Sequence, residues 1–265
     1  MTDDWKSKYN YVGDFSEGLI NVKLNDKYGF VDHNGKEVIP LKYDNVDSFS
    51  EGLAAVKLGD DKTGKWGFVN TQGKEVIPLK YDNAWSFSDG LARVKLNGKW
   101  GFVNTQGKEV IPLKYDNAGD FSEGLSRVSL GDDETGKWGF VNTQGKEVIP
   151  LEYDDAAPFE EGLAAVKLNG KYGYIDQQGK EVIPLKYDYA WSFHEGLAGV
   201  ALNGQWGFVD QQGKEVVPLK YDDAFSFHEG LARVKLNGKK GYVDKEGHEY
   251  WDMTEDEVRR QMRNR

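Results

Sequence analysis

The chain has 265 residues, with 34 Lys and Arg against 44 Asp and Glu, a net charge of −10, 32 Gly and no Cys. This composition excludes a disulfide framework, a Cys-ligated zinc site and a thiol nucleophile, and its acidic balance argues against a nucleic-acid partner, whose phosphates require clustered Lys and Arg. No run approaches the roughly 18 to 20 apolar residues of a membrane span, and the start MTDDWKSKYN lacks an apolar signal segment, so we expect a cytoplasmic protein without membrane association.

One pentapeptide pattern, F-x-[DE]-G-L, divides the chain into repeats. It begins at Phe15, Phe49, Phe87, Phe121, Phe159, Phe193 and Phe227, with spacings of 34, 38, 34, 38, 34 and 34 residues. Both longer spacings contain a four-residue expansion at the same place, in the segments Gly59 to Gly64 and Gly131 to Gly136. An insertion tolerated at one fixed place indicates a surface turn, so the chain consists of seven units with one period.

The unit from Phe87 to Asp120 predicts short antiparallel strands. Its Asn97-Gly98 pair supplies the two positive φ angles that a type I′ hairpin turn requires. We therefore expect Leu91 to Leu96 to pair with Lys99 to Asn104. No segment within the repeats has a helical periodicity of any length.

The second half of the unit predicts two further strands. Gly107 suits a three-residue loop with a left-handed residue, and the chain then enters a third strand, Glu109 to Pro112. Because Pro112 has no N–H to donate to a strand ladder, it is expected at an edge or a strand end. Leu113 to Ala118 is predicted as a fourth short strand.

The hairpin register assigns the side chains to two unlike faces of each sheet. Val94 faces Gly101 on a small apolar face, whereas Lys95 faces Trp100 on a bulky face. A sheet with apolar groups on both faces must be covered on both, so we expect the bulky face of one unit to pack on the small face of the next. In this interpretation Gly101 lacks a Cβ because the neighbouring sheet approaches closely.

These strands predict an all-β fold of seven tandem repeats of about 34 residues, with residues 1–251 forming a seven-bladed β-propeller. The segment Lys8 to Asn10 would complete the last sheet, which ends at Glu249 to Trp251, and so close the ring. The alternative is an open β-repeat superhelix. Residues 252–265 are expected to form a short terminal helix, because Thr254 to Glu257 has capping-box spacing and Arg residues follow. That helix would be a cap on the last unit or a docking peptide.

Trp-Gly dipeptides occupy the same place in four units, at Trp66-Gly67, Trp100-Gly101, Trp138-Gly139 and Trp206-Gly207. Each is followed by an aromatic-aliphatic pair and then by Gly-Lys-Glu-Val-[IV]-Pro, so that from Lys8 to Trp251 the chain resembles the bacterial WG (KWG) β-repeat family. Tyr28, Tyr172 and Lys240 replace the Trp elsewhere, and Lys240 marks the last unit as a terminal cap. The resemblance implies a tandem β-array that serves as an interaction module, and it supplies no catalytic residues.

Two local patterns suggest ligand sites but have simpler explanations. The segment Gly59 to Lys65, repeated at Gly131 to Lys137, matches most of a phosphate loop, yet it joins two strands and Trp follows in place of Ser or Thr. Its acidic residues also lack calcium-loop spacing. His194 and His228, each followed by Glu, would share a divalent ion if neighbouring units stack, or are exposed turn residues. We expect no metal and no cofactor.

Two columns of carboxylates recur through the units. One follows Tyr at Asp44, Asp82, Asp116, Asp154, Asp188 and Asp222, and the other lies in the turn at Glu17, Glu51, Asp89, Glu123, Glu161, Glu195 and Glu229. Hydrogen bonds to turn amides explain most of these positions. Catalytic carboxylates are placed in unlike environments, which a repeated column does not provide, so we expect no catalytic residue.

Two further columns vary between otherwise similar units. The first, here called the aromatic column, is Gly13, Asp47, Trp85, Gly119, Ala157, Trp191 and Phe225, and the second, the arginine column, is Asn21, Ala55, Arg93, Arg127, Ala165, Gly199 and Arg233. Variation between Gly and Trp indicates a solvent-facing position, and aromatic and Arg side chains are frequent interface anchors. The candidate partner-binding residues are therefore Trp85, Trp191, Phe225, Arg93, Arg127 and Arg233, with drift at unconstrained positions as the alternative.

The sequence favours a monomeric, non-catalytic scaffold whose repeated units present an extended surface to a protein partner. The second hypothesis is a glycan-binding module, because exposed aromatic rings stack on sugar rings. The third is an enzyme with a carboxylate site in a channel.

Overall fold

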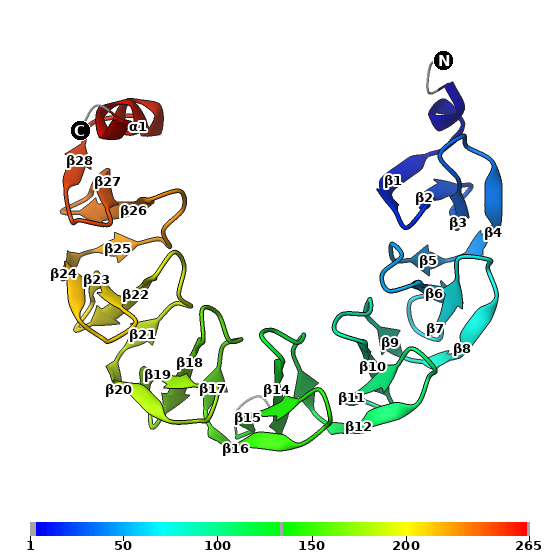
Figure 1. Ribbon diagram of the computed structural model, residues 1–265, viewed down its shortest axis with the longest axis horizontal. Coiled ribbons are helices and arrows are strands. Elements are labelled where there is room, and N and C mark those ends of the chain that lie inside the picture. The colour runs from blue at the N-terminus through cyan, green and yellow to red at the C-terminus, as the bar shows by residue number, and fades with distance from the viewer. Residues whose placement is uncertain (1–3, 133–134, 264–265) are drawn as a thin grey trace. The chain divides into compact units, whose positions relative to one another are not determined.

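The computed structural model describes residues 4–132 and 135–263. Within these ranges the strands form seven four-stranded antiparallel sheets, one after another along the chain (Figure 1). A 3-10 helix, η1 (Asp4–Lys8), precedes the sheets, and an α-helix, α1 (Glu255–Arg263), follows them. The seven repeats and the all-β class predicted from the sequence are confirmed.

Each sheet uses the same four strands in sequence order. The first strands are β1 (Tyr11–Ser16), β5 (Asn45–Val46), β9 (Asn83–Ala84), β13 (Asn117–Ala118), β17 (Asp155–Ala156), β21 (Tyr189–Ala190) and β25 (Asp223–Ala224). The second strands are β2 (Leu19–Leu24), β6 (Leu53–Leu58), β10 (Leu91–Leu96), β14 (Leu125–Leu130), β18 (Leu163–Leu168), β22 (Leu197–Leu202) and β26 (Leu231–Leu236). The third strands are β3 (Lys27–Val31), β7 (Lys65–Asn70), β11 (Lys99–Asn104), β15 (Lys137–Asn142), β19 (Lys171–Asp176), β23 (Gln205–Asp210) and β27 (Lys239–Asp244). The fourth strands are β4 (Glu37–Tyr43), β8 (Glu75–Tyr81), β12 (Glu109–Tyr115), β16 (Glu147–Tyr153), β20 (Glu181–Tyr187), β24 (Glu215–Tyr221) and β28 (Glu249–Trp251).

The chain divides into two compact units. One comprises Met1–Phe121, Val128–Leu130 and Thr143–Lys146, and the other comprises Ser122–Arg127, Gly131–Asn142 and Glu147–Arg265. The first three sheets therefore belong to the first of these two compact parts of the chain, and the last three sheets belong to the second.

The predicted hairpin register is confirmed. Leu96 pairs with Lys99, and Val94 pairs with Gly101. Asn97 and Gly98 have φ angles of 51° and 80°, as a type I′ turn requires. The strongest local turn signal thus determined which side chains share a face of the sheet.

The predicted fourth strand, Leu113 to Ala118, is wrong. The strand β12 continues through Pro112 to Tyr115, and Asn117–Ala118 forms the first strand of the following sheet. Pro112 is tolerated because β12 is the last strand of its sheet, so its missing N–H breaks no ladder. The sequence pattern did not reveal that the chain passes from one sheet to the next at this point.

The structure also corrects the role predicted for Gly101. Between the pairs Trp100–Tyr115 and Phe102–Ile111, the strand β12 contains extra residues and bulges. A Cβ built on Gly101 would lie 2.5 Å from the carbonyl oxygen of Ile111. The Gly in each Trp-Gly dipeptide therefore makes room for the bulge of its own sheet, and not for the neighbouring sheet.

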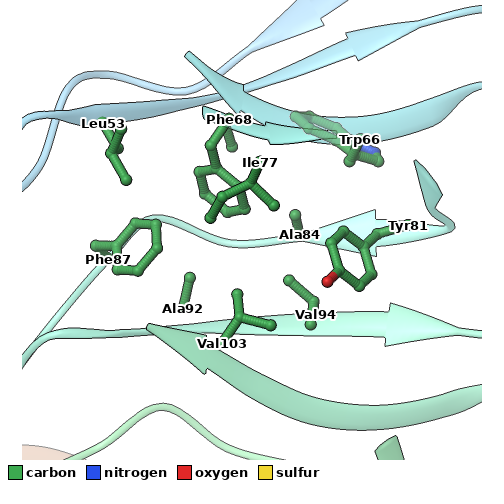
Figure 2. Packing of buried hydrophobic residues seen from close by; sticks show 11 residues of the cluster. Leu53, Trp66, Phe68, Ile77, Tyr81, Ala84, Phe87, Ala92, Val94 and Val103 are labelled. Atoms are coloured by element: carbon green, nitrogen blue, oxygen red, sulfur yellow. The ribbon is translucent and has the colours of Figure 1, made fainter. Parts of the chain in front are cut away.

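Unlike faces of successive sheets pack together, as predicted (Figure 2). The rings of Trp66, Phe68 and Tyr81 on one sheet lie against the small side chains of Ala92 and Val94 on the next, and all of them are buried. Equivalent residues form the clusters between the last three sheets. Each sheet thus depends on its neighbour for burial of its apolar face.

The ring closure expected from Lys8 to Asn10 is not present. Lys8 ends the helix η1, and the following strand β1 pairs with β2 in its own sheet. The last sheet is complete without it, because β25 to β28 supply all four strands. Within the described part of the chain, no strand of the first sheet pairs with a strand of the last, so the sheets are not closed by a shared strand.

Both ends of the array are covered by short helices. Trp5 in η1 packs on the apolar cluster around Val22 of the first sheet, and Val258 in α1 is fully buried against Leu231 and Tyr250 of the last. The helix α1 begins with the predicted capping box. Among the described residues, no helix is long and apolar enough to cross a membrane.

Candidate functional site

The two variable columns lie side by side in the structure. A backbone hydrogen bond joins Trp85 to Arg93 at 3.0 Å, and Phe225 is joined to Arg233 in the same way at 2.9 Å. In each repeat the two positions therefore share one local site. Together with the ring of the Trp-Gly dipeptide, they form what is here called the column site of that repeat.

In the third repeat an arginine fills the column site. The Arg93 guanidinium carbon lies 4.9 Å from the centre of the Trp85 ring and 5.1 Å from the centre of the Trp100 ring. The guanidinium donates to the carbonyl oxygen of Ala118 and lies 3.2 Å from the carboxylate of Asp120. Its side chain is only 13% exposed. The guanidinium thus contacts two aromatic rings, a carbonyl oxygen and a carboxylate within the chain.

Arginine also contributes to the column sites of the fourth and last repeats. The Arg127 guanidinium lies 5.0 Å from the centre of the Trp138 ring and donates to the carbonyl oxygen of Ala156 at 2.6 Å. The Arg233 guanidinium lies 4.9 Å from the centre of the Phe225 ring, and its side chain is exposed. Of the three candidate arginines, Arg233 is the one that the structure leaves open to solvent.

In the sixth repeat an aromatic ring takes the place of the arginine. Trp191 stacks on Trp206 with ring centres 5.6 Å apart and planes 16° apart. A Cβ on Gly199 would lie 2.8 Å from Cδ1 of Trp191, so the glycine allows the indole to lie flat against the sheet. The candidate aromatic residues Trp85, Trp191 and Phe225 are each about half exposed, and each ring contacts a neighbouring side chain.

In the fifth repeat neither of the two variable columns contributes an arginine or an aromatic ring to the column site. Ala157 and Ala165 occupy the two columns, and a cavity of about 250 Å³ opens beside them. We call this cavity the aromatic pocket. It is lined by Arg127, Asp155, Ala156, Ala157, Pro158, Ala165, Tyr172, Tyr189, Ala190, Trp191, Ser192 and Trp206.

Four near-parallel rings form one wall of the aromatic pocket. Tyr172 stacks on Tyr189 at 6.4 Å, and Tyr189 stacks on Trp206 at 6.2 Å, with interplanar angles of 21° and 22°. Trp191 continues the stack on Trp206. Tyr189 is 62% exposed and was missed in the sequence reasoning. The signal was available, because the same position is Asn or Asp in the four preceding units from Asn45 onward and in the unit that follows, with Tyr189 as the exception among them.

Charged groups also line the aromatic pocket. The Tyr172 hydroxyl donates to Oδ2 of Asp155 at 3.1 Å, while Oδ1 of Asp155 accepts from the backbone N–H of Ala156. Burial, together with the negative charge of Asp155, raises the pKa of Tyr172 to about 12. The Tyr172 phenol is therefore neutral at neutral pH, and Asp155 and Arg127 line the pocket beside it.

The two carboxylate columns support the fold, as the sequence predicted. In the turn column, Glu161 accepts a hydrogen bond from the N–H of Gly196 in the next repeat, and the last member, Glu229, pairs with Arg259 of α1. In the other column, the side chain of Lys65 donates to Asp82 and holds the pKa of that carboxyl below its ordinary value. These carboxylates stabilise turns and link successive repeats.

The other candidate ligand groups are engaged within the chain. Asp60 accepts from the N–H groups of Lys62 and Thr63, so its own carboxylate occupies the amides that a phosphate would need. The matching segment Gly131 to Lys137 includes residues 133 and 134, which lie outside the described residues. His194 lies 3.4 Å from the carboxylate of Glu160. Glu195, which follows His194 in the sequence, forms an ion pair with Lys245 at 2.9 Å.

One group with metal-ligand chemistry, which the sequence reasoning missed, lies in the last repeat. Asp244, Glu246 and His248 lie close together in one turn. The carboxylate of Asp244 already accepts hydrogen bonds from the Tyr250 hydroxyl and the N–H of His248. These bonds account for its burial without an ion.

Comparison with known proteins supports the fold. No curated protein matches the chain. The chain is similar to a crystal structure of the eukaryotic initiation factor, with 13% identity and a TM-score of 0.51, over 89% of this chain and 73% of that chain. It is also similar to Hsv2p of Kluyveromyces lactis, with 9% identity and a TM-score of 0.47, over 91% of this chain and 96% of that chain. The first likeness shows the fold alone, a propeller-like series of four-stranded sheets.

The repeats themselves identify the family. The model of the WG containing repeat matches residues 6–28, 28–62, 66–100, 100–132, 138–172, 172–206 and 206–239. Each of the four Trp-Gly dipeptides begins a match, and the last match ends just before Lys240, where the Trp is replaced. The chain therefore belongs to the WG repeat family.

Proposed function

We propose that this WG repeat protein is a non-catalytic scaffold for protein–protein interaction and that the aromatic pocket is a principal contact for its partner. The observation that carries the proposal is the exposed ring stack beside the cavity. Tyr189 and Trp191 expose 62% and 49% of their surface, yet each is held by a stacked neighbour. Rigid aromatic rings lose little conformational entropy on binding, which makes them effective anchors.

A catalytic role has less support. The recurrent carboxylates are used in turns and ion pairs, as at Glu161 and Asp82. The aromatic pocket contributes a single carboxylate, that of Asp155, together with a phenol of raised pKa. A glycan-binding module is the second candidate, because the exposed ring faces of Tyr189 and Trp191 would also stack on sugars.

Affinity purification from the native host tests the scaffold proposal. We expect a protein that is retained by the wild-type chain and lost with the double variant Tyr189→Ala, Trp191→Ala. Tyr11→Ala is the matched control, because Tyr11 is an exposed ring that packs on Tyr28 in the first repeat. Equal retention by all three chains would contradict the proposal, and saturable binding of a sugar with no protein retained would favour the glycan module.

A further inference from the structure

The aromatic pocket corresponds in position to the arginine site of the third repeat. In the repeat alignment Ala165 corresponds to Arg93, Tyr172 to Trp100 and Ala157 to Trp85. Ala165, Ala157 and Tyr172 all line the pocket. The cavity therefore lies where two large side chains of the third repeat are replaced by alanine.

The polar surroundings correspond as well. The third-repeat guanidinium bonds to the carbonyl oxygen of Ala118 and pairs with Asp120. The equivalent residues of the sixth repeat, Ala190 and Ser192, both line the aromatic pocket. The backbone at Ala118 accepts the guanidinium of the third repeat. Its counterpart at Ala190 borders the cavity of the fifth repeat.

We propose, building on the scaffold function above, that the aromatic pocket binds an arginine side chain of the protein partner in the place that Arg93 occupies in its own repeat. The guanidinium stacks on the ring of Tyr172, and its edge donates to the backbone at Ala190. A planar guanidinium lies flat on a ring and donates several hydrogen bonds from its edge at the same time, whereas an ammonium group is a compact charge without a planar fork of donors. The pocket therefore selects arginine over lysine.

The charge of the chain favours a cationic side chain. The protein has a net charge of −10, and the carboxylate of Asp155 lies in the pocket wall. Arg127, which also lines the pocket, is already committed to the Trp138 ring and the carbonyl oxygen of Ala156. Arginines also follow one another in this column at Arg93 and Arg127, so neighbouring column sites of the fold accept them in succession.

Titration with N-acetyl-arginine methylamide at millimolar concentration tests the proposal, with the indole N–H signals of Trp191 and Trp206 followed by NMR. We expect saturable shifts with the wild-type chain and at least about tenfold weaker binding of the lysine and citrulline analogues. Ala165→Arg should weaken binding of the probe by at least about tenfold, because its own guanidinium occupies the pocket.

Two further variants keep the test decisive. Gln205→Arg adds the same charge in the same sheet as Trp206, at a position that is Lys in the other repeats, and should leave binding unchanged. Ala165→Met fills the cavity without a guanidinium and should also block binding of the probe. This variant replaces Ala165→Arg in the test if the Arg variant does not fold. Equal binding of the citrulline analogue, or undiminished binding to a folded Ala165→Met or Ala165→Arg chain, would overturn the proposal.

The arginine proposal and the scaffold proposal fail in different ways. Partner retention that depends on Tyr189 and Trp191 but is not competed by N-acetyl-arginine methylamide leaves the scaffold function intact and overturns the arginine proposal. Partner retention that is unchanged when both Tyr189 and Trp191 are replaced by Ala overturns the proposal that the aromatic pocket contacts the partner. Shifts that saturate with N-acetylglucosamine or galactose, and not with the arginine probe, overturn both in favour of a glycan.

Discussion

The column sites of the third and fifth repeats differ in three side chains on one backbone design. In the third repeat, Arg93 lies 4.9 Å and 5.1 Å from the centres of the Trp85 and Trp100 rings, and its guanidinium donates to the backbone at the start of the next sheet. In the fifth repeat, Ala157 and Ala165 leave a cavity of about 250 Å³ in the corresponding place. Because the sheet does not need these side chains for its strand pairing, a site that is filled in one repeat can be an open cavity in another through substitution alone.

The largest effect is expected at a position that the two repeats share. Gly101→Val should destabilise the fold by at least about 3 kcal/mol, because the added side chain meets the backbone of the β12 bulge, which cannot move away as a flexible side chain would. Gly173→Val should cost a similar amount in the fifth repeat, where the carbonyl oxygen of Ile183 is equally close. Denaturant unfolding measures both, and wild-type stability in either variant would refute this explanation of the Trp-Gly dipeptide.

The next largest effect is expected where the column site is filled. Arg93→Ala should cost about 2 to 4 kcal/mol, because it removes two cation–π contacts and the hydrogen bond to Ala118 and leaves a cavity. Arg233→Ala serves as the control, since that side chain is exposed, and should cost less than about 1 kcal/mol. If thermal unfolding shows the same loss of stability in both variants, burial of Arg93 contributes nothing to the stability of the fold.

Substitutions in the aromatic column should cause an intermediate loss of stability. Trp85→Ala and Trp191→Ala each remove a ring that is half exposed and packed on one face, so we expect about 1 to 1.5 kcal/mol, below the roughly 3 to 5 kcal/mol of a core ring. Only Trp191→Ala should also weaken partner binding. If both variants weaken it equally, the aromatic pocket is not the specific contact.

Filling the open site should stabilise the chain. Ala165→Arg places a guanidinium beside Tyr172 and the backbone of Ala190, so we expect a gain of about 1 kcal/mol. The same measurement of unfolding distinguishes a pocket that can accept arginine from one that cannot. A clear loss of stability would indicate that the fifth-repeat site has a different shape from the third.

The smallest effect concerns the hydrogen bond between Tyr172 and Asp155. Burial, the charge of Asp155 and this bond together raise the pKa of Tyr172 from 10.0 to about 12 on folding, so the neutral phenol stabilises the folded state fully below pH 10, and this stabilisation is lost as the pH rises toward 12. The free energy of unfolding of the wild type should exceed that of Tyr172→Phe by about 0.5 to 1 kcal/mol at neutral pH, and this difference should fall as the pH rises above 10. A difference that stays constant with pH would show that the phenol proton is not involved.

Much of the fold followed from local patterns in the sequence. The repeat, the Asn97-Gly98 hairpin, the register of Val94 against Gly101 and the capping box of α1 were all predicted correctly. Turn chemistry acts over a few residues, and strand register follows from the turn. The unlike faces, and hence the stacking of successive sheets, follow in turn from the register.

The tertiary structure decided what depends on several distant segments at once. The bulge in β12 shows why Gly101 is required, and no turn signal marks it in the sequence. The passage of the chain into the next sheet at Asn117 was likewise hidden, as was the contact between the aromatic and arginine columns. The aromatic pocket exists because Ala157 and Ala165 are small while Tyr172 and Tyr189 are large. A cavity is the space that side chains from separate repeats leave between them, so only their placement in three dimensions reveals it.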